Sequence, residues 1–206
     1  LTTRRQRQMC IRDSVAAIPP REDARDALIL APALKGIKNL EDLPPQTKFG
    51  TASLRRQAQS LRLNPDVDIG LLRGNVGTRI SRLTHGNENT DPIAATLLAM
   101  AGLKRLGLIE RVDKIMPIDQ MLPAPGQGAL AVQTRKDDAE LIELLKPLNC
   151  AITLAQITAE REFMARLDGS CKTPIAAYAE VTDDRLTLTG RLLSVDGQIC
   201  AEAEIT

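Results

Sequence analysis

The chain has 206 residues, of which 43% are hydrophobic and only 1% aromatic, and its 27 basic and 26 acidic side chains leave a formal net charge of +1. This balance creates no global field that would attract nucleic acid or an anionic membrane, and so few aromatic side chains cannot form a base-stacking platform. No apolar run approaches the roughly 18 residues of a membrane span. We therefore expect neither a nucleic-acid nor a membrane partner.

The cysteines are too far apart in the sequence to indicate a metal site. None belongs to a Cys-x-x-Cys pair, which argues against both a zinc site and a dense disulfide framework and favours a reducing, cytoplasmic location. The single histidine, His85, lies in a polar stretch that predicts a solvated loop. Metal-based and Ser-His-Asp mechanisms therefore have little support. The four cysteines are Cys10, Cys150, Cys171 and Cys200.

Residues 1–14 differ in character from the rest of the chain. They begin with Leu1, carry four arginines and show no regular pattern. We expect them to be foreign or misassembled residues; an arginine-rich targeting presequence is the alternative.

Alternating strand-like and helix-like segments follow. Their order predicts an α/β domain with a sheet rich in parallel strands, in which ligands bind at the carboxyl ends of the strands. The pattern predicts strands at residues 15–18, 27–30, 49–53 and 67–72, helices at 54–63 and 78–83, and a strand followed by a helix over 93–103.

The second half of the chain predicts a small α+β unit. A rigid Pro- and Gly-rich turn spans residues 122–128, and alternating strands with Asp-Asp and Asp-Gly turns close the chain. The apolar positions of the last predicted helix are 152, 155, 159, 163 and 167. The expected elements are a strand at 129–133, helices at 137–148 and 151–167, and strands at 176–181, 186–193 and 199–205.

Two segments concentrate arginines and hydroxyls beside glycines. They read Gly-Thr-Ala-Ser-Leu-Arg-Arg at residues 50–56 and Leu-Arg-Gly-Asn-Val-Gly-Thr-Arg at residues 72–79, and each follows a predicted strand. The planar guanidinium fork matches a carboxylate, and a helix start offers free backbone N–H groups. The pattern predicts a site for a polyanionic ligand, although any one of these arginines could instead lie on a solvated helix face.

Cys171 lies in a small-residue turn, Gly-Ser-Cys at residues 169–171, directly after the last predicted helix. A thiol projecting from such a turn is accessible, and the adjacent Lys172 favours its thiolate form. Two interpretations are open: a reactive cysteine near the anion site, or a structural cysteine.

Six ordered motifs give residues 15–206 a specific resemblance to the porphobilinogen deaminase (hydroxymethylbilane synthase) family. The resemblance implies a three-domain transferase that polymerises four porphobilinogen units, with loss of ammonia, into hydroxymethylbilane during tetrapyrrole and heme biosynthesis. It further implies a monomer that needs no metal. The motifs occupy residues 17–28, 50–56, 72–79, 101–107, 122–128 and 169–174.

The resemblance also implies roles for individual residues. A dipyrromethane cofactor would be attached through a thioether to Cys171, and its acetate and propionate arms would need cationic and hydroxyl partners. Arg73 and Arg105 would hold the carboxylates of porphobilinogen. The implied cofactor contacts are Thr51, Ser53, Arg55, Arg56 and Arg79.

One part of the family pattern is missing from the sequence. The family's catalytic aspartate belongs to a His-Ser-x-Lys-Asp segment expected just before residue 15, and residues 1–14 contain nothing similar. Asp23 and Asp26 belong to a different motif, so we name no catalytic residue. We expect a fragment that also lacks a helix after residue 206 and that is inactive or poorly active by itself.

The expected architecture has lobes resembling those of periplasmic binding proteins. Residues 15–48 and 120–148 would form a partial first lobe, residues 49–119 a second lobe, and residues 149–206 a C-terminal α+β domain that carries the cofactor. Two rival functions stay open: a non-enzymatic module that binds a small carboxylate, and a phosphate or nucleic-acid binder.

Overall fold

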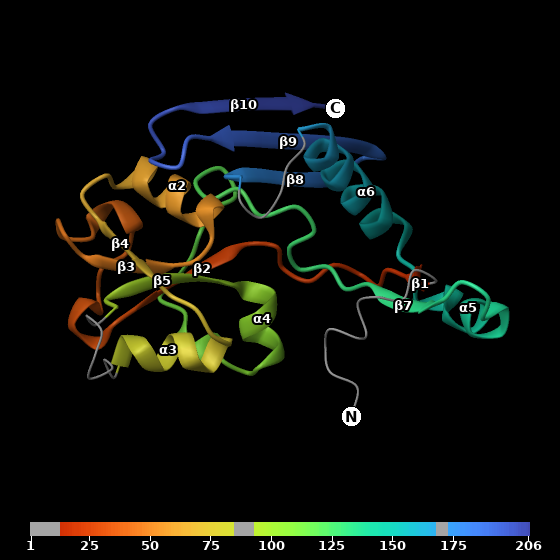
Figure 1. Cartoon of the computed structure of the whole chain (residues 1–206), viewed down its shortest axis with the longest axis horizontal. Helices are drawn as coiled ribbons and strands as arrows, with labels where there is room; N and C mark the ends of the chain where they lie inside the picture. Colours follow the sequence, from red (N-terminus) through yellow and green to blue (C-terminus); the bar gives the residue numbers. More distant parts are fainter. Residues whose placement is uncertain (1–12, 85–92, 168–172) are drawn as a thin grey trace.

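A computed structural model describes residues 13–84, 93–167 and 173–206. It contains a five-stranded sheet with helices on both faces, a two-stranded ribbon, and a three-stranded sheet packed on one long helix (Figure 1). The predictions made for Cys10, His85 and Cys171 lie outside these residues. Within them, no helix is long and apolar enough to cross a membrane, and no group of His, Cys, Asp and Glu side chains could hold a metal ion.

The five-stranded sheet has the order β4-β3-β5-β2-β6. β3 pairs in parallel with β4 and with β5, whereas β2 pairs antiparallel with β5 and β6. The predicted parallel arrangement is therefore confirmed for three strands only. The bounds are β2 (Asp26–Leu30), β3 (Lys48–Thr51), β4 (Asp68–Leu71), β5 (Ala95–Ala99) and β6 (Lys114–Ile115).

Apolar cores lie on both faces of this sheet. Along β2, Leu28 and Leu30 belong to one core together with Phe49, and Ala27 and Ile29 belong to the other. The alternation follows from the two-residue period of a strand. Figure 1 shows α2 on one face and α3 and α4 on the other. The bounds are α2 (Leu54–Leu63), α3 (Val76–Thr84) and α4 (Met100–Arg105), with the 3-10 turns η1 (Pro32–Leu34), η2 (Leu40–Asp42) and η3 (Ile109–Arg111).

The position of β2 differs from the predicted division of the chain. Residues 15–48 were assigned to a partial first lobe, yet β2 lies between β5 and β6 inside the sheet formed by residues 48–115. All five residues of β2 are buried. An apolar run indicates a buried strand but does not say which sheet contains it, and here it is the five-stranded sheet.

The two-stranded ribbon joins residues far apart in the sequence. β1 (Asp13–Ala17) pairs antiparallel with β7 (Val132–Arg135), with a register irregularity between Val15 and Ala17. The predicted strand at 129–133 thus begins three residues later. The helix predicted at 137–148 ends early, because the chain tightens into a 3-10 turn that contains Pro147: α5 (Ala139–Leu145) and η4 (Lys146–Leu148).

The C-terminal unit follows the prediction closely. Its strands form an antiparallel sheet of order β10-β9-β8 that packs on α6. Asp183 and Asp184 have φ values of 50° and 59°, as a two-residue hairpin turn requires. The bounds are α6 (Ala151–Arg166), β8 (Ile175–Thr182), β9 (Arg185–Leu193) and β10 (Cys200–Ile205).

The apolar stripe predicted for α6 is only partly correct. Ile152 and Leu167 are exposed, whereas the buried positions of the helix are Thr153, Ile157 and Glu160. Two of these three residues are polar, so a pattern based on hydrophobicity could not find this face.

Glu160 ties α6 to β8 and to two connecting segments, residues 18–25 between β1 and β2 and residues 116–131 between β6 and β7. Its fully buried carboxylate accepts hydrogen bonds from Arg21 Nη1 (2.6 Å) and Nη2 (3.2 Å) and from the backbone N–H groups of Gly126 (2.7 Å) and Ala179 (2.8 Å). Because these donors come from three separate segments, one side chain fixes their relative positions.

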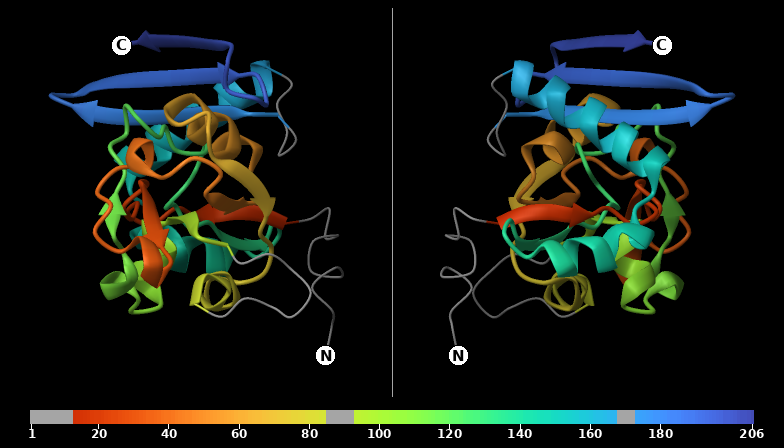
Figure 2. Two further views of the ribbon diagram at one scale, coloured as in Figure 1. Left: turned by 90° about the vertical axis from the view of Figure 1, so that its left-hand side faces the viewer. Right: turned by 90° about the vertical axis from the view of Figure 1, so that its right-hand side faces the viewer.

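Arg191 makes a similar connection between the two larger sheets, which lie in separate layers with α2 between them (Figure 2). From β9, its Nη1 donates to Gln59 Oε1 of α2 (2.7 Å) and its Nη2 to the carbonyl of Asp119 (2.8 Å). Gln59 in turn accepts from the Leu122 N–H (2.9 Å). Buried polar groups therefore join these layers.

Replacement of Glu160 should show how much this junction stabilises the fold. Glu160→Ala leaves a buried guanidinium and two buried N–H groups without their acceptor, and we expect a loss of about 3–5 kcal/mol in the free energy of unfolding. Urea denaturation measures the change. The exposed Glu162→Ala variant is the matched control, and equal midpoints for the two variants would contradict the assignment.

Substitutions at Gly126 and Gly128 distinguish the cost of steric overlap from the cost of backbone strain. Both have positive φ (75° at Gly126 and 87° at Gly128), but a Cβ would meet nothing at Gly126 and would overlap the Glu22 carbonyl oxygen at Gly128. We expect Gly126→Ala to cost about 1–2 kcal/mol, and Gly128→Ala about 2 kcal/mol more. Thermal and urea unfolding test this order, and a smaller loss for Gly128→Ala would refute the close approach of the two segments.

Candidate anion-binding site

The two arginine-containing segments lie at one edge of the five-stranded sheet. β3 and β4 run in parallel and end at Thr51 and Leu71, so the turns that follow them, residues 52–53 and 72–75, leave the same edge. These turns lead into α2 and α3. The prediction that both segments follow the carboxyl ends of parallel strands is confirmed.

Hydroxyl groups shape the turn between β3 and α2. Thr51 Oγ1 accepts the Ser53 N–H (3.1 Å), and Ser53 Oγ caps α2 by accepting the Arg56 N–H (3.4 Å). Each hydroxyl keeps its own hydrogen for donation. Both predicted hydroxyl contacts therefore also have a local structural role.

The first two predicted arginines meet on Asp26, at the start of β2. Arg55 Nη1 donates to Asp26 Oδ2 (2.8 Å), while Arg56 donates from Nε (3.1 Å) and Nη2 (2.7 Å) to Oδ1. The exposed fractions are 0% for Asp26, 5% for Arg55 and 9% for Arg56. Neither arginine lies on a solvated helix face, so that alternative is excluded for both.

Sequence reasoning missed Asp26 as a member of this site. The only available signal was an acidic residue at the start of a buried apolar strand, a position where a carboxylate needs a partner. Gln127 was missed as well. Its Nε2 donates to Asp26 Oδ1 (3.0 Å), and its Oε1 accepts from Arg55 Nη2 (3.2 Å).

The group formed by Asp26, Arg55 and Arg56 carries one more positive than negative charge. Burial by itself raises the pKa of the Asp26 carboxyl, but the charges and hydrogen bonds of Arg55 and Arg56 together lower it to about 2. Asp26 is therefore ionised at neutral pH and balances one of the two guanidinium charges.

Arg79 adds a further positive charge nearby. Its Nε donates to the carbonyl of Gly74 (2.9 Å), and its pKa is lowered by burial and by the charge of Arg56. Among the described residues, Arg56 pairs with no carboxylate other than Asp26, and Arg79 pairs with none. Guanidinium groups in excess, with hydroxyl donors beside them, fit a ligand that bears several carboxylates.

Arg73 and Arg105 are less constrained. Both are exposed: Arg73 precedes Gly74 in the turn after β4, and Arg105 ends α4. In the described parts of the chain, neither forms an ion pair, and no hydrogen bond joins either to the Asp26 group. Their predicted contact with substrate remains a prediction.

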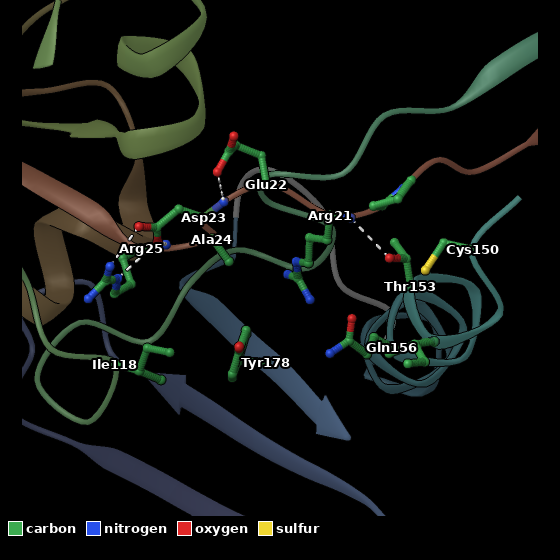
Figure 3. Close-up of a pocket in the computed structure, with 12 residues that line it drawn as sticks. Arg21, Glu22, Asp23, Ala24, Arg25, Ile118, Cys150, Thr153, Gln156 and Tyr178 are labelled. Atoms are coloured by element: carbon green, nitrogen blue, oxygen red, sulfur yellow. Dashed lines mark hydrogen bonds and ion pairs between the residues drawn. The ribbon is translucent and has the colours of Figure 1, made fainter. Parts of the chain in front are cut away.

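A pocket of about 390 Å³ lies between the segment 20–25, α6 and β8 (Figure 3). The Arg21 N–H donates to Thr153 Oγ1 (3.0 Å) at its edge, and Cys150 lines it at the start of α6. Hydrogen bonds from the Thr153 hydroxyl and backbone lower the pKa of the Cys150 thiol.

The cations of this pocket already have partners within the chain. Arg21 pairs with Glu160 and Arg25 with Asp23, and none of the predicted ligand residues that the structure describes lines the pocket. We therefore place the candidate site at the Asp26 group, where positive charge is in excess.

Comparison with known families identifies the chain's relatives. Residues 7–143 match the family model described as porphobilinogen deaminase, dipyromethane cofactor binding domain, and residues 154–206 match the one described as porphobilinogen deaminase, C-terminal domain. The chain belongs to the porphobilinogen deaminase family. The first match starts inside the segment 1–14, which was expected to be foreign to the family.

Curated porphobilinogen deaminases from several bacteria resemble the chain along most of its length. That of Nitrobacter hamburgensis is 46% identical over 88% of this chain, that of Syntrophotalea carbinolica 46% over 87%, and that of Geotalea uraniireducens 44% over 92%. These matches cover 54–56% of the relatives, so the chain spans about half the length of the porphobilinogen deaminases it matches.

The Asp26 carboxylate should make stability depend on pH in acid. Its pKa is about 2 in the folded chain, below the ordinary 3.8, so its contribution is complete above pH 4 and is lost as the pH falls towards 2. We expect the difference in unfolding free energy between wild type and Asp26→Asn to shrink by about 2 kcal/mol between pH 5 and pH 2. Urea titrations across this range test the effect, and a constant difference would contradict it.

Proposed function

We propose that this chain binds the dipyrromethane cofactor of a porphobilinogen deaminase and contributes to the polymerisation of four porphobilinogen units into hydroxymethylbilane. The observation that carries the proposal is the excess of buried positive charge around Asp26, Arg55 and Arg56, with Arg79 beside them. This group lies within the segment that matches the cofactor-binding domain. Two unbalanced guanidinium charges suit a ligand with acidic arms.

The proposed cofactor would be linked through a thioether to Cys171. When bound, the dipyrromethane supplies the pyrrole ring to which new units are added. Arg56 and Arg79 would neutralise its carboxylates, and the Thr51 and Ser53 hydroxyls would donate hydrogen bonds to them. Arg55 contributes through its pairing with Asp26.

We further propose that Arg73 and Arg105 hold the carboxylates of incoming porphobilinogen. Both are exposed and without ion-pair partners in the described chain, so they can reorient towards a mobile substrate. Each added unit brings more carboxylates, which makes additional cations at the same edge useful. No residue is assigned as the catalytic acid, because neither Asp23 nor Asp26 is available: both are paired with arginine.

The proposal includes a monomeric, cytoplasmic enzyme whose lobes resemble those of periplasmic binding proteins. Helices on both faces of a partly parallel sheet, with the site at the strand ends, support that lobe type. The balanced net charge and the scarcity of aromatic residues argue against a nucleic-acid partner.

Intact-mass analysis tests the covalent part of the proposal. The chain, produced in a heme-synthesising bacterium or incubated with porphobilinogen, should carry a pyrrole adduct that survives denaturation. Cys171→Ser should abolish the adduct. Cys150→Ser should retain it, although the pKa of the Cys150 thiol is lowered.

The alternatives make different predictions in the same assays. A chain that binds porphobilinogen but never gains mass would be a non-enzymatic carboxylate-binding module. Binding to polynucleotide with a steep salt dependence, and no affinity for porphobilinogen, would indicate a nucleic-acid binder.

A further inference from the structure

We propose that Asp26 is a positioning residue that presents Arg56 to the carboxylates of the ligand, and that Arg55 is its internal counter-charge rather than a ligand contact. The inference rests on the proposed function, because it concerns how that site grips an acidic pyrrole. Arg55 and Arg56 were both expected to contact the cofactor, and the inference gives them different roles.

The geometry of Arg56 leaves one edge of its guanidinium available. Nε and Nη2 both donate to Asp26 Oδ1, whereas Nη1 donates to no described residue. A planar fork held along one edge cannot rotate, so its remaining donor points in a set direction. Arg56 also lies close enough for its charge to lower the pKa of Arg79. The open donor therefore belongs to the part of the site where positive charge is unbalanced.

Arg55 is committed to the protein interior. Its Nη1 donates to both Asp26 Oδ2 (2.8 Å) and the carbonyl of Leu122 (2.9 Å), and its Nη2 donates to Gln127 Oε1 (3.2 Å). The side chain is more completely buried than that of Arg56, and its Nε has no partner among the described residues. A ligand carboxylate could replace the partners of Arg55 Nη1 and Nη2 only after these bonds were broken.

Gln127 fixes the carboxylate that orients Arg56. Its Nε2 donates to Asp26 Oδ1 (3.0 Å) and to the carbonyl of Ala24 (2.6 Å), which joins the two connecting segments on either side of the carboxylate. The backbone carbonyl of Ala24 thus fixes Gln127, and Gln127 fixes the orientation of the Asp26 carboxylate. The direction of the Arg56 fork follows from it.

Charge-balanced variants separate the two roles. All are made in a Cys171→Ser background, in which no adduct occupies the cofactor position. Porphobilinogen, whose carboxylates stand in for those of one cofactor ring, is the soluble probe for that position, and its affinity is measured by calorimetry. Asp26→Asn leaves two buried guanidinium groups without a carboxylate, and Arg56→Gln removes the proposed contact. The double variant Asp26→Asn with Arg55→Gln restores the original net charge of the group. Asp23→Asn, which removes a neighbouring surface pair, is the matched control.

We expect Asp26→Asn and Arg56→Gln each to weaken porphobilinogen binding by about tenfold or more, as the loss of a charge-assisted hydrogen bond requires. The double variant should return to within about threefold of the parent, because the group regains its original net charge and the side-chain oxygen of the asparagine introduced at position 26 can still accept from Arg56 and orient it. Asp23→Asn should bind like the parent. Unfolding midpoints are measured for every variant.

Three outcomes would overturn the inference: a double variant as weak as Arg56→Gln, Asp26→Asn binding like the parent, or a parent that binds no porphobilinogen. If Asp26→Asn does not fold, the double variant compared with Arg56→Gln still decides. The proposed function is judged separately by the adduct on Cys171. If the chain with Cys171 gains the adduct but all the variants bind porphobilinogen with equal affinity, only the positioning role is refuted. If the variants show the predicted affinities but the chain with Cys171 gains no adduct, only the covalent chemistry is refuted.

Discussion

The candidate site depends on a single buried carboxylate shared by two arginines. A buried charge is costly unless it is paired and hydrogen-bonded, and Asp26 meets this condition with contacts to Arg55, Arg56 and Gln127. Because two guanidinium groups share one carboxylate, the group is stable enough to fold yet keeps an excess of positive charge. That excess makes the edge of the sheet attractive to an acidic ligand before any ligand is bound.

The same kind of interaction joins the parts of the chain. Glu160 collects donors from two connecting segments and β8, and Arg191 links β9 to α2 through Gln59. Apolar contacts fill the cores on either side of the five-stranded sheet, whereas these polar junctions set the orientation between layers. Hydrogen bonds to charged groups are directional, so each junction permits one arrangement and resists others.

The connecting segments have a part in both the fold and the site. Gly128 brings one segment against the other at Glu22, and the neighbouring Gln127 reaches Asp26 and Arg55. A shift of the backbone at the contact between Glu22 and Gly128 would therefore be transmitted to the arginines through two or three hydrogen bonds. Gln127 thus links the contact between these two segments to the arginines of the candidate site.

Local patterns in the sequence determined most of the secondary structure, the family, and the placement of two arginine segments after parallel strands. Three signals can be recognised in the sequence alone because each depends on neighbours along the chain: the two-residue alternation of strands, the turn residues, and the segment 50–56. The tertiary structure alone decided that β2 lies inside the five-stranded sheet and that Arg55 and Arg56 share Asp26. It also decided that α6 buries Thr153 and Glu160 rather than its predicted apolar stripe. Those features pair residues 29 to 139 positions apart, and a buried charge selects its partner by three-dimensional distance, which no local pattern records.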